Sequence, residues 1–77
     1  MDGYEKNNPR LGRYQHYKGQ YYQVIGLARH SETREELVIY QALDGKQELW
    51  ARPKKMFLER VMANGQEVPR FKLINKP

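Results

Sequence analysis

Short apolar runs separated by polar turn signals predict a succession of short β-strands along this chain. The runs are rich in β-branched and aromatic residues, which favour strands, and end at signals such as Lys18-Gly19-Gln20 and Asp44-Gly45. The first four predicted strands are Arg13–Tyr17, Tyr21–Ala28, Leu37–Leu43 and Glu48–Arg52. Five or six short strands with no long helix between them predict an antiparallel sheet that closes on itself.

The segment that follows the fourth strand carries two patterns. Apolar residues within Met56–Met62 recur at spacings of three and four, as on a helix that would end near Gly65. However, Asn64-Gly65 is also a strong signal for a two-residue hairpin turn. We expect a short helical turn at Pro53–Lys55 and then a hairpin whose second strand is Val68–Leu73. Pro69 would make that last strand an edge strand, because proline donates no ladder hydrogen bond.

These patterns predict an all-β fold, a small antiparallel SH3-like barrel with at most a short helical turn after Pro53. Seventy-seven residues are enough for one domain only. We expect a flexible N-terminal arm over residues 1–10, the barrel domain over residues 11–74 and a C-terminal tail over residues 75–77.

The composition indicates the cellular compartment and excludes some kinds of cofactor site. The chain contains no cysteine, which excludes disulfides and zinc sites of the cysteine type and suits a reducing compartment. The first residues, beginning Met1-Asp2-Gly3, lack the apolar run of a secretory signal, and no apolar run is long enough to span a bilayer. We therefore expect a soluble cytoplasmic monomer with no cofactor and no membrane partner.

Charge and aromatic content point to a binding surface. The formal net charge is +5, which favours polyanionic partners, although such a charge also keeps a small domain soluble. The chain has nine aromatic residues, more than so small a barrel can bury, so some must reach the surface. Exposed rings beside arginines are suited to stacking on nucleic-acid bases, and they also suit a proline-rich peptide or a methylated cation.

We hypothesise a binding module for nucleic acid or nucleotide, with a protein- or peptide-interaction module or small subunit as the alternative. A purely structural role, in which the tyrosines cover the barrel, is the third interpretation. The candidate ligand-binding residues are Tyr14, His16, Tyr22, Arg29, His30, Ser31, Glu32, Thr33, Tyr40, Trp50 and Arg52. We expect them to centre on the His30–Thr33 loop, lying beside Trp50 and Arg52.

Catalysis is the least favoured hypothesis for the His30–Thr33 loop. His30 could act as an acid or base and Glu32 could orient it, but neighbouring residues rarely form a working triad. A turn in which Ser31 or Thr33 bonds the backbone explains the same residues more simply. His16 and His30 are too far apart in the sequence for a standard metal spacing, so we expect no catalytic residue and no metal site.

Several motifs follow one another along the chain: Gly12-Arg13-Tyr14-Gln15-His16-Tyr17-Lys18-Gly19, Tyr21-Tyr22-x-Val24, Ala28-Arg29-His30-Ser31-Glu32-Thr33, Val38-x-Tyr40, Trp50-Ala51-Arg52-Pro53 and Met56-Phe57. Their order resembles an uncharacterised bacterial family, domain of unknown function 1653. The resemblance runs from about Gly12 to Phe71, and it implies a small stand-alone protein with an SH3-type barrel and the hairpin at Asn64-Gly65. It implies no activity, substrate or catalytic residue.

Overall fold

A computed structural model describes residues 9–75 of the chain, and most of the predicted N-terminal arm lies outside this range. Its elements are β1 (Gly12–His16), β2 (Tyr21–Arg29), β3 (Glu36–Ala42), β4 (Leu49–Pro53), α1 (Lys54–Phe57), β5 (Arg60–Ala63), β6 (Gln66–Pro69) and β7 (Phe71–Asn75). Every strand pair is antiparallel. The predicted all-β antiparallel class is therefore confirmed, with seven strands in this range and β7 reaching one residue past the predicted domain end.

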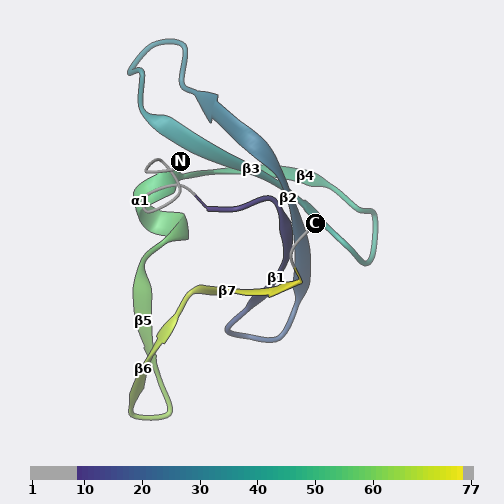
Figure 1. Ribbon diagram of the computed structural model, residues 1–77, viewed down its shortest axis with the longest axis vertical. Helices are drawn as coiled ribbons and strands as arrows, with labels where there is room; N and C mark the ends of the chain where they lie inside the picture. Colours follow the sequence, from purple (N-terminus) through teal and green to yellow (C-terminus); the bar gives the residue numbers. More distant parts are fainter. Residues whose placement is uncertain (1–8, 76–77) are drawn as a thin grey trace.

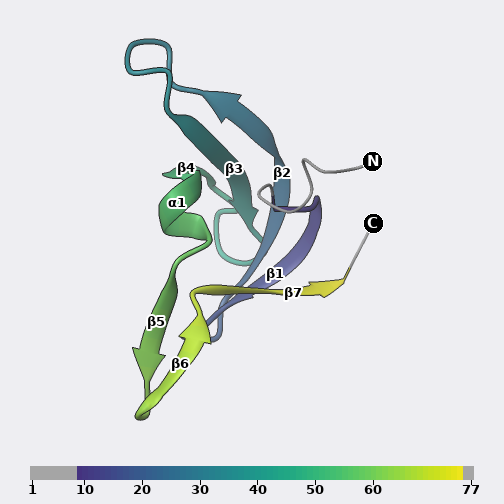
Figure 2. The same ribbon diagram turned by 60° about the vertical axis from the view of Figure 1, so that its left-hand side comes forward.

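The strands form one curved sheet and one separate hairpin. The five-stranded sheet has the order β4-β3-β2-β1-β7, and β5 pairs with β6 alone. Figures 1 and 2 show α1 against the five-stranded sheet and the β5–β6 hairpin projecting at the end opposite to the β2–β3 loop. Within residues 9–75, β4 and β7 are the two edges of the main sheet, so its ladder of hydrogen bonds curves around the core without closing on itself.

The segment after β4 contains both of the features expected from its sequence. Pro53 precedes the single helical turn α1, a position where its missing N–H leaves no helical hydrogen bond unmade. The hairpin turns at Asn64 and Gly65, whose φ values of 53° and 79° suit the left-handed geometry of a two-residue turn. The predicted strand Val68–Leu73 is in fact two strands, because the chain changes sheets at Arg70.

The concave side of the sheet holds an aromatic core. Phe57 of α1 and Phe71 of β7 stack with ring centroids 4.2 Å apart and planes 5° apart. The rings of Tyr14 and Tyr40 meet Phe57 edge-on at 5.3 and 5.7 Å. These four residues are buried together with two valines. The six buried core residues are Tyr14, Val24, Val38, Tyr40, Phe57 and Phe71.

A β-bulge in β2 changes which side chains face the core. Simple alternation places Ala28 on the same face as Val24. The pairing with β3 shifts between Val24 and Gly26, so that Ile25 has no partner in the register. Beyond this bulge, Leu27 is opposite the buried Val38, whereas Ala28 lies on the other face of the sheet. The extra residue therefore reverses the alternation for the end of β2.

Arg70 fastens the projecting hairpin to the rest of the domain. Its guanidinium donates from Nε to the Met56 carbonyl at 3.1 Å and from Nη2 to Glu59 Oε1 at 2.8 Å. Its backbone N–H donates to the Glu59 carbonyl, and its own carbonyl accepts the Tyr17 N–H. One residue thus joins α1, the base of the hairpin and the turn between β1 and β2.

Replacing Arg70 with alanine should lower the free energy of unfolding by about 1.5–3 kcal/mol, the usual value of hydrogen bonds to a charged group. Arg60→Ala is the matched control, because Arg60 pairs with Glu67 on an exposed surface at 3.6 Å. Such pairs contribute about 0–1 kcal/mol. Urea denaturation of both variants measures the difference, and equal losses would contradict the fastening role of Arg70.

Candidate aromatic and arginine binding face

One row of side chains crosses four neighbouring strands on the concave face. Ring centroids of His16 on β1 and Tyr22 on β2 are 6.4 Å apart, and those of Tyr22 and Tyr40 on β3 are 5.3 Å apart. Trp50 on β4 lies directly opposite Tyr40 in the ladder, and Arg52 follows two residues later on the same face. We call these five residues the aromatic–arginine face.

Four members of this face line a shallow hollow of about 210 Å³: Tyr22, Tyr40, Trp50 and Arg52. Tyr40 is buried and forms its floor, while 49% of Trp50 is exposed. The volume of the hollow is several times the roughly 30 Å³ that one water molecule occupies in the liquid, so the hollow has room for one ring-sized group. A planar ligand could contact the face or edge of an exposed indole there.

Arg52 is held by its neighbours while the end of its side chain stays available. Its Nε donates to the Tyr40 hydroxyl at 3.2 Å, and its Cζ lies 5.6 Å from the centroid of the Phe71 ring. Neither Nη1 nor Nη2 forms a hydrogen bond or ion pair within residues 9–75. A guanidinium fixed in this way presents two terminal nitrogens to an anion, with little rotamer entropy left to lose on binding.

His16 lies in a positively charged part of this face. Burial lowers the pKa of His16, and the charges of Arg52, Arg70 and Lys18 lower it further. Its Nδ1 accepts the Lys18 backbone N–H at 3.1 Å, so the neutral ring carries its proton on Nε2. The ring also lies 4.7 Å from that of Tyr17 and 4.9 Å from that of Phe71.

Tyr14 and Tyr22 differ in their availability to a ligand. Burial raises the pKa of Tyr14, whose hydroxyl donates to the Arg10 carbonyl at 2.8 Å, so this side chain belongs to the core. Tyr22 is half-buried, and its pKa is raised by burial and then by Tyr40 and Asp44. Tyr22 therefore keeps its hydroxyl proton and can donate it to a ligand in the hollow.

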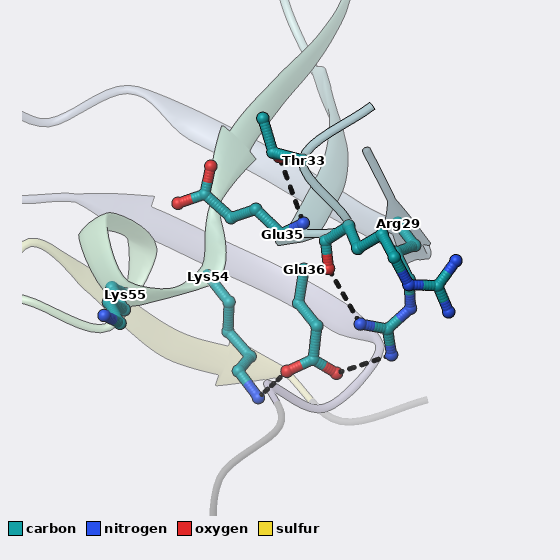
Figure 3. A pocket seen from close by; sticks show the side chains of 7 residues that line it. Arg29, Thr33, Glu35, Glu36, Lys54 and Lys55 are labelled. Atoms are coloured by element: carbon teal, nitrogen blue, oxygen red, sulfur yellow. Dashed lines mark hydrogen bonds and ion pairs between the residues drawn. The ribbon is translucent and has the colours of Figure 1, made fainter. Parts of the chain in front are cut away.

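Arg29 and the loop after it surround a different hollow, at the β2–β3 end of the sheet. This second hollow, of about 430 Å³, is lined mainly by charged residues, among them Lys54 and Lys55 (Figure 3). Arg29 and Lys54 both pair with Glu36, and Arg29 also donates to the Arg34 carbonyl at 2.8 Å. The hydrogen bond from Lys54 lowers the pKa of Glu36. Arg29 and Lys54 thus share one carboxylate, which is already a partner for both of them.

The loop residues mainly stabilise their own turn. His30 Nδ1 accepts the backbone N–H groups of Glu32 at 3.1 Å and Thr33 at 3.3 Å, and Thr33 Oγ1 accepts that of Glu35. Ser31 and Glu32 are exposed at the tip. The structure therefore separates the predicted site residues into two groups, since Trp50 and Arg52 line one hollow and Arg29 and Thr33 line another.

The candidate residues chosen from the sequence did not include two residues that shape this face, Phe71 and Arg70. Phe71 supports Arg52 from below, and Arg70 contributes to the positive charge around His16. Both belong to the last part of the chain, which comes next to β1 through the pairing of β1 with β7, where His16 is opposite Phe71. Neither a motif nor a spacing indicates this pairing.

Residues 9–75 contain neither a metal-binding cluster nor a helix suited to crossing a membrane. No group of three or more histidine, cysteine, aspartate or glutamate side chains in this range could hold a metal ion. No helix in the same range has the length and hydropathy that a bilayer crossing requires.

The lowered pKa of His16 predicts that the protein loses stability in mild acid. The unfolded chain takes up a proton at His16 near the ordinary pKa of 6.5, while the folded protein takes it up only at lower pH. The free energy of unfolding should therefore decrease as the pH falls from 7 to 5. Glu36 does not contribute in this window, because its lowered pKa lies below 4.5.

Urea denaturation at several pH values measures this decrease. His16→Asn should remove much of it, and His30→Asn, at an exposed position where the β2–β3 loop begins, is the matched control. An equal decrease in His16→Asn and in the unsubstituted protein would show that other groups cause the acid sensitivity.

Comparison with known proteins gives a family and no activity. A family model described as a protein of unknown function, DUF1653, matches residues 12–73. The crystal structure of a DUF1653 protein from Bordetella bronchiseptica is similar, with 34% identity and a TM-score of 0.82 over 90% of this chain and 91% of that chain. No curated protein matches. The family match covers most of the chain and agrees with the structural similarity, so the protein belongs to DUF1653, a family of unknown function.

Proposed function

We propose that this protein is a small binding module that holds nucleotide units of single-stranded nucleic acid, or a free nucleotide, on its aromatic–arginine face. The observation that carries the proposal is the hollow in which the available guanidinium end of Arg52 lies beside the exposed Trp50. One group can contact a phosphate while the other contacts a base.

The energetics of the two contacts suit this class of ligand. Stacking of a base on an aromatic side chain contributes about 1–3 kcal/mol and tolerates any base. The phosphate beside it would meet Arg52, and a continuing chain could pass Lys18, a cation near His16. A net charge of +5 adds long-range attraction for a polyanion.

The same geometry argues against one of the other ligands considered. A methylated cation needs an aromatic cage without a competing positive charge, and here Arg52 forms part of the wall. A proline-rich peptide remains the alternative ligand, because it too docks between aromatic rings. Pull-down from a bacterial lysate with and without nuclease separates the two, since partners that persist after nuclease treatment favour a protein or peptide.

The setting we propose is the bacterial cytoplasm. The chain has no cysteine, as suits a reducing compartment, and the DUF1653 protein of known structure comes from a bacterium. Immunolocalisation in the source cells tests this placement.

Trp50 is the only tryptophan of the chain, so its intrinsic fluorescence reports directly on this face. Titration with a single-stranded oligonucleotide should change that fluorescence, and the affinity should fall as salt rises, because phosphate contacts release counterions. Trp50→Ala should weaken binding by about 1–3 kcal/mol, measured by anisotropy of a labelled oligonucleotide.

Arg52→Ala and Arg34→Ala remove the same charge from different places. Arg34 lies in the exposed β2–β3 loop, so it serves as the control for net charge. We expect Arg52→Ala to weaken binding several-fold more than Arg34→Ala. Equal effects of the two substitutions, or an affinity that does not depend on salt, would contradict a phosphate contact at this face.

A further inference from the structure

The outer edge of β4 has unpaired backbone groups at defined positions. The Ala42 N–H donates to the Glu48 carbonyl, and the Leu43 N–H donates to the Tyr21 carbonyl. Hydrogen-bonded pairs alternate along an antiparallel ladder, so Glu48, Trp50 and Arg52 direct their backbone groups toward β3. Leu49 and Ala51 direct their N–H and C=O groups to the open edge, where no strand within residues 9–75 meets them.

The first three residues of β4 lack the usual protection of an edge strand against pairing. Natural edge strands are commonly protected by lysine, proline or inward-pointing charges at their centre. In β4 such residues occur only at the C-terminal end, as Arg52 and Pro53. The part before them, Leu49–Ala51, is exposed and carries no charge or proline, with 63% of Leu49 accessible. The other edge strand of the sheet, β7, carries Lys72. The β4 edge is therefore a template for another strand.

We propose that two copies of this chain associate through their β4 strands, antiparallel about a two-fold axis at Trp50, to form one continuous sheet. In this register Leu49 lies opposite Ala51 of the second copy, and by symmetry Ala51 lies opposite its Leu49. All the free backbone groups of both residues are then paired, which gives four hydrogen bonds across the axis.

The two neighbouring registers of the β4 pair leave more backbone groups or charges without a partner. A pairing centred on Ala51 places Leu49 opposite Pro53 of the second copy, which has no N–H to donate. A pairing centred on Leu49 leaves Glu48 opposite Trp50 and without a cation. The register centred on Trp50 therefore makes the fullest use of this edge.

Charge complementarity between Glu48, the residue before β4, and Arg52 in β4 supports a second copy as the occupant. In the same register Glu48 lies opposite Arg52 of the second copy, twice by symmetry, and the two Trp50 side chains lie opposite each other. Cross-strand pairs of opposite charge and of two aromatic rings both stabilise antiparallel strands. Glu48 forms no ion pair within residues 9–75, and the guanidinium end of Arg52 is available there. The strand is thus complementary to itself.

Sedimentation velocity without nucleic acid tests this register. The unsubstituted protein should sediment as a dimer that dissociates on dilution. Glu48→Arg and Arg52→Glu should each raise the dissociation constant about tenfold or more, because each places like charges opposite one another twice. An equimolar mixture of the two variants should restore the dimer, because every cross-strand pair is then of opposite charge.

Ala51→Pro provides a second test that leaves the β3–β4 ladder intact, since the Ala51 N–H faces the open edge. This variant should be a folded monomer by sedimentation and circular dichroism, whereas Ala51→Thr, which keeps the N–H, should remain a dimer. A monomeric unsubstituted protein at its highest soluble concentration, a dimeric Ala51→Pro variant, or a mixture that stays monomeric would overturn the proposal. All these measurements are made without nucleic acid, so their failure would leave the proposed ligand-binding function standing. A dimer of this kind would compete with the proposed ligand, because both use Trp50 and Arg52.

Discussion

The stacked pair of Phe57 and Phe71 supports both the core and the proposed binding face. Phe57 lies on α1, which directly follows the edge strand β4, and Phe71 lies on the other edge strand, β7. Their contact therefore joins the two edges of the sheet across its concave side. The same Phe71 ring lies under the guanidinium of Arg52 and edge-on to His16. The position of the binding residues therefore depends on the packing of the core.

This arrangement suits a chain with few other means of stabilisation. A domain of 77 residues buries a limited share of its surface, and no disulfide can supplement the core. Aromatic side chains bury 150–250 Å² each and gain additional energy from edge-to-face contacts, which makes a core of few residues effective. The hairpin β5–β6 contributes little to this core, and the hydrogen bonds of Arg70 hold its base in place.

The number of aromatic residues correctly predicted that some rings reach the surface, but it did not show which ones. Trp50, Tyr17 and Tyr21 are exposed, whereas Tyr14 and Tyr40 are buried. Two-residue alternation sorts side chains into faces only within one strand, and it fails beyond the bulge at Ile25. Which face is concave depends on the curvature of the whole sheet, which no local pattern specifies.

From the sequence alone, the all-β class, the helical turn after Pro53 and the hairpin at Asn64-Gly65 could be predicted, because each rests on the conformational preference of a few adjacent residues. Only the tertiary structure placed Phe71 beside Arg52 and separated the His30–Thr33 loop from Trp50. Those relations arise from the register of strands distant in the chain, such as β1 with β7. Register is selected by the packing of the whole core, so it emerges only when every strand is in place.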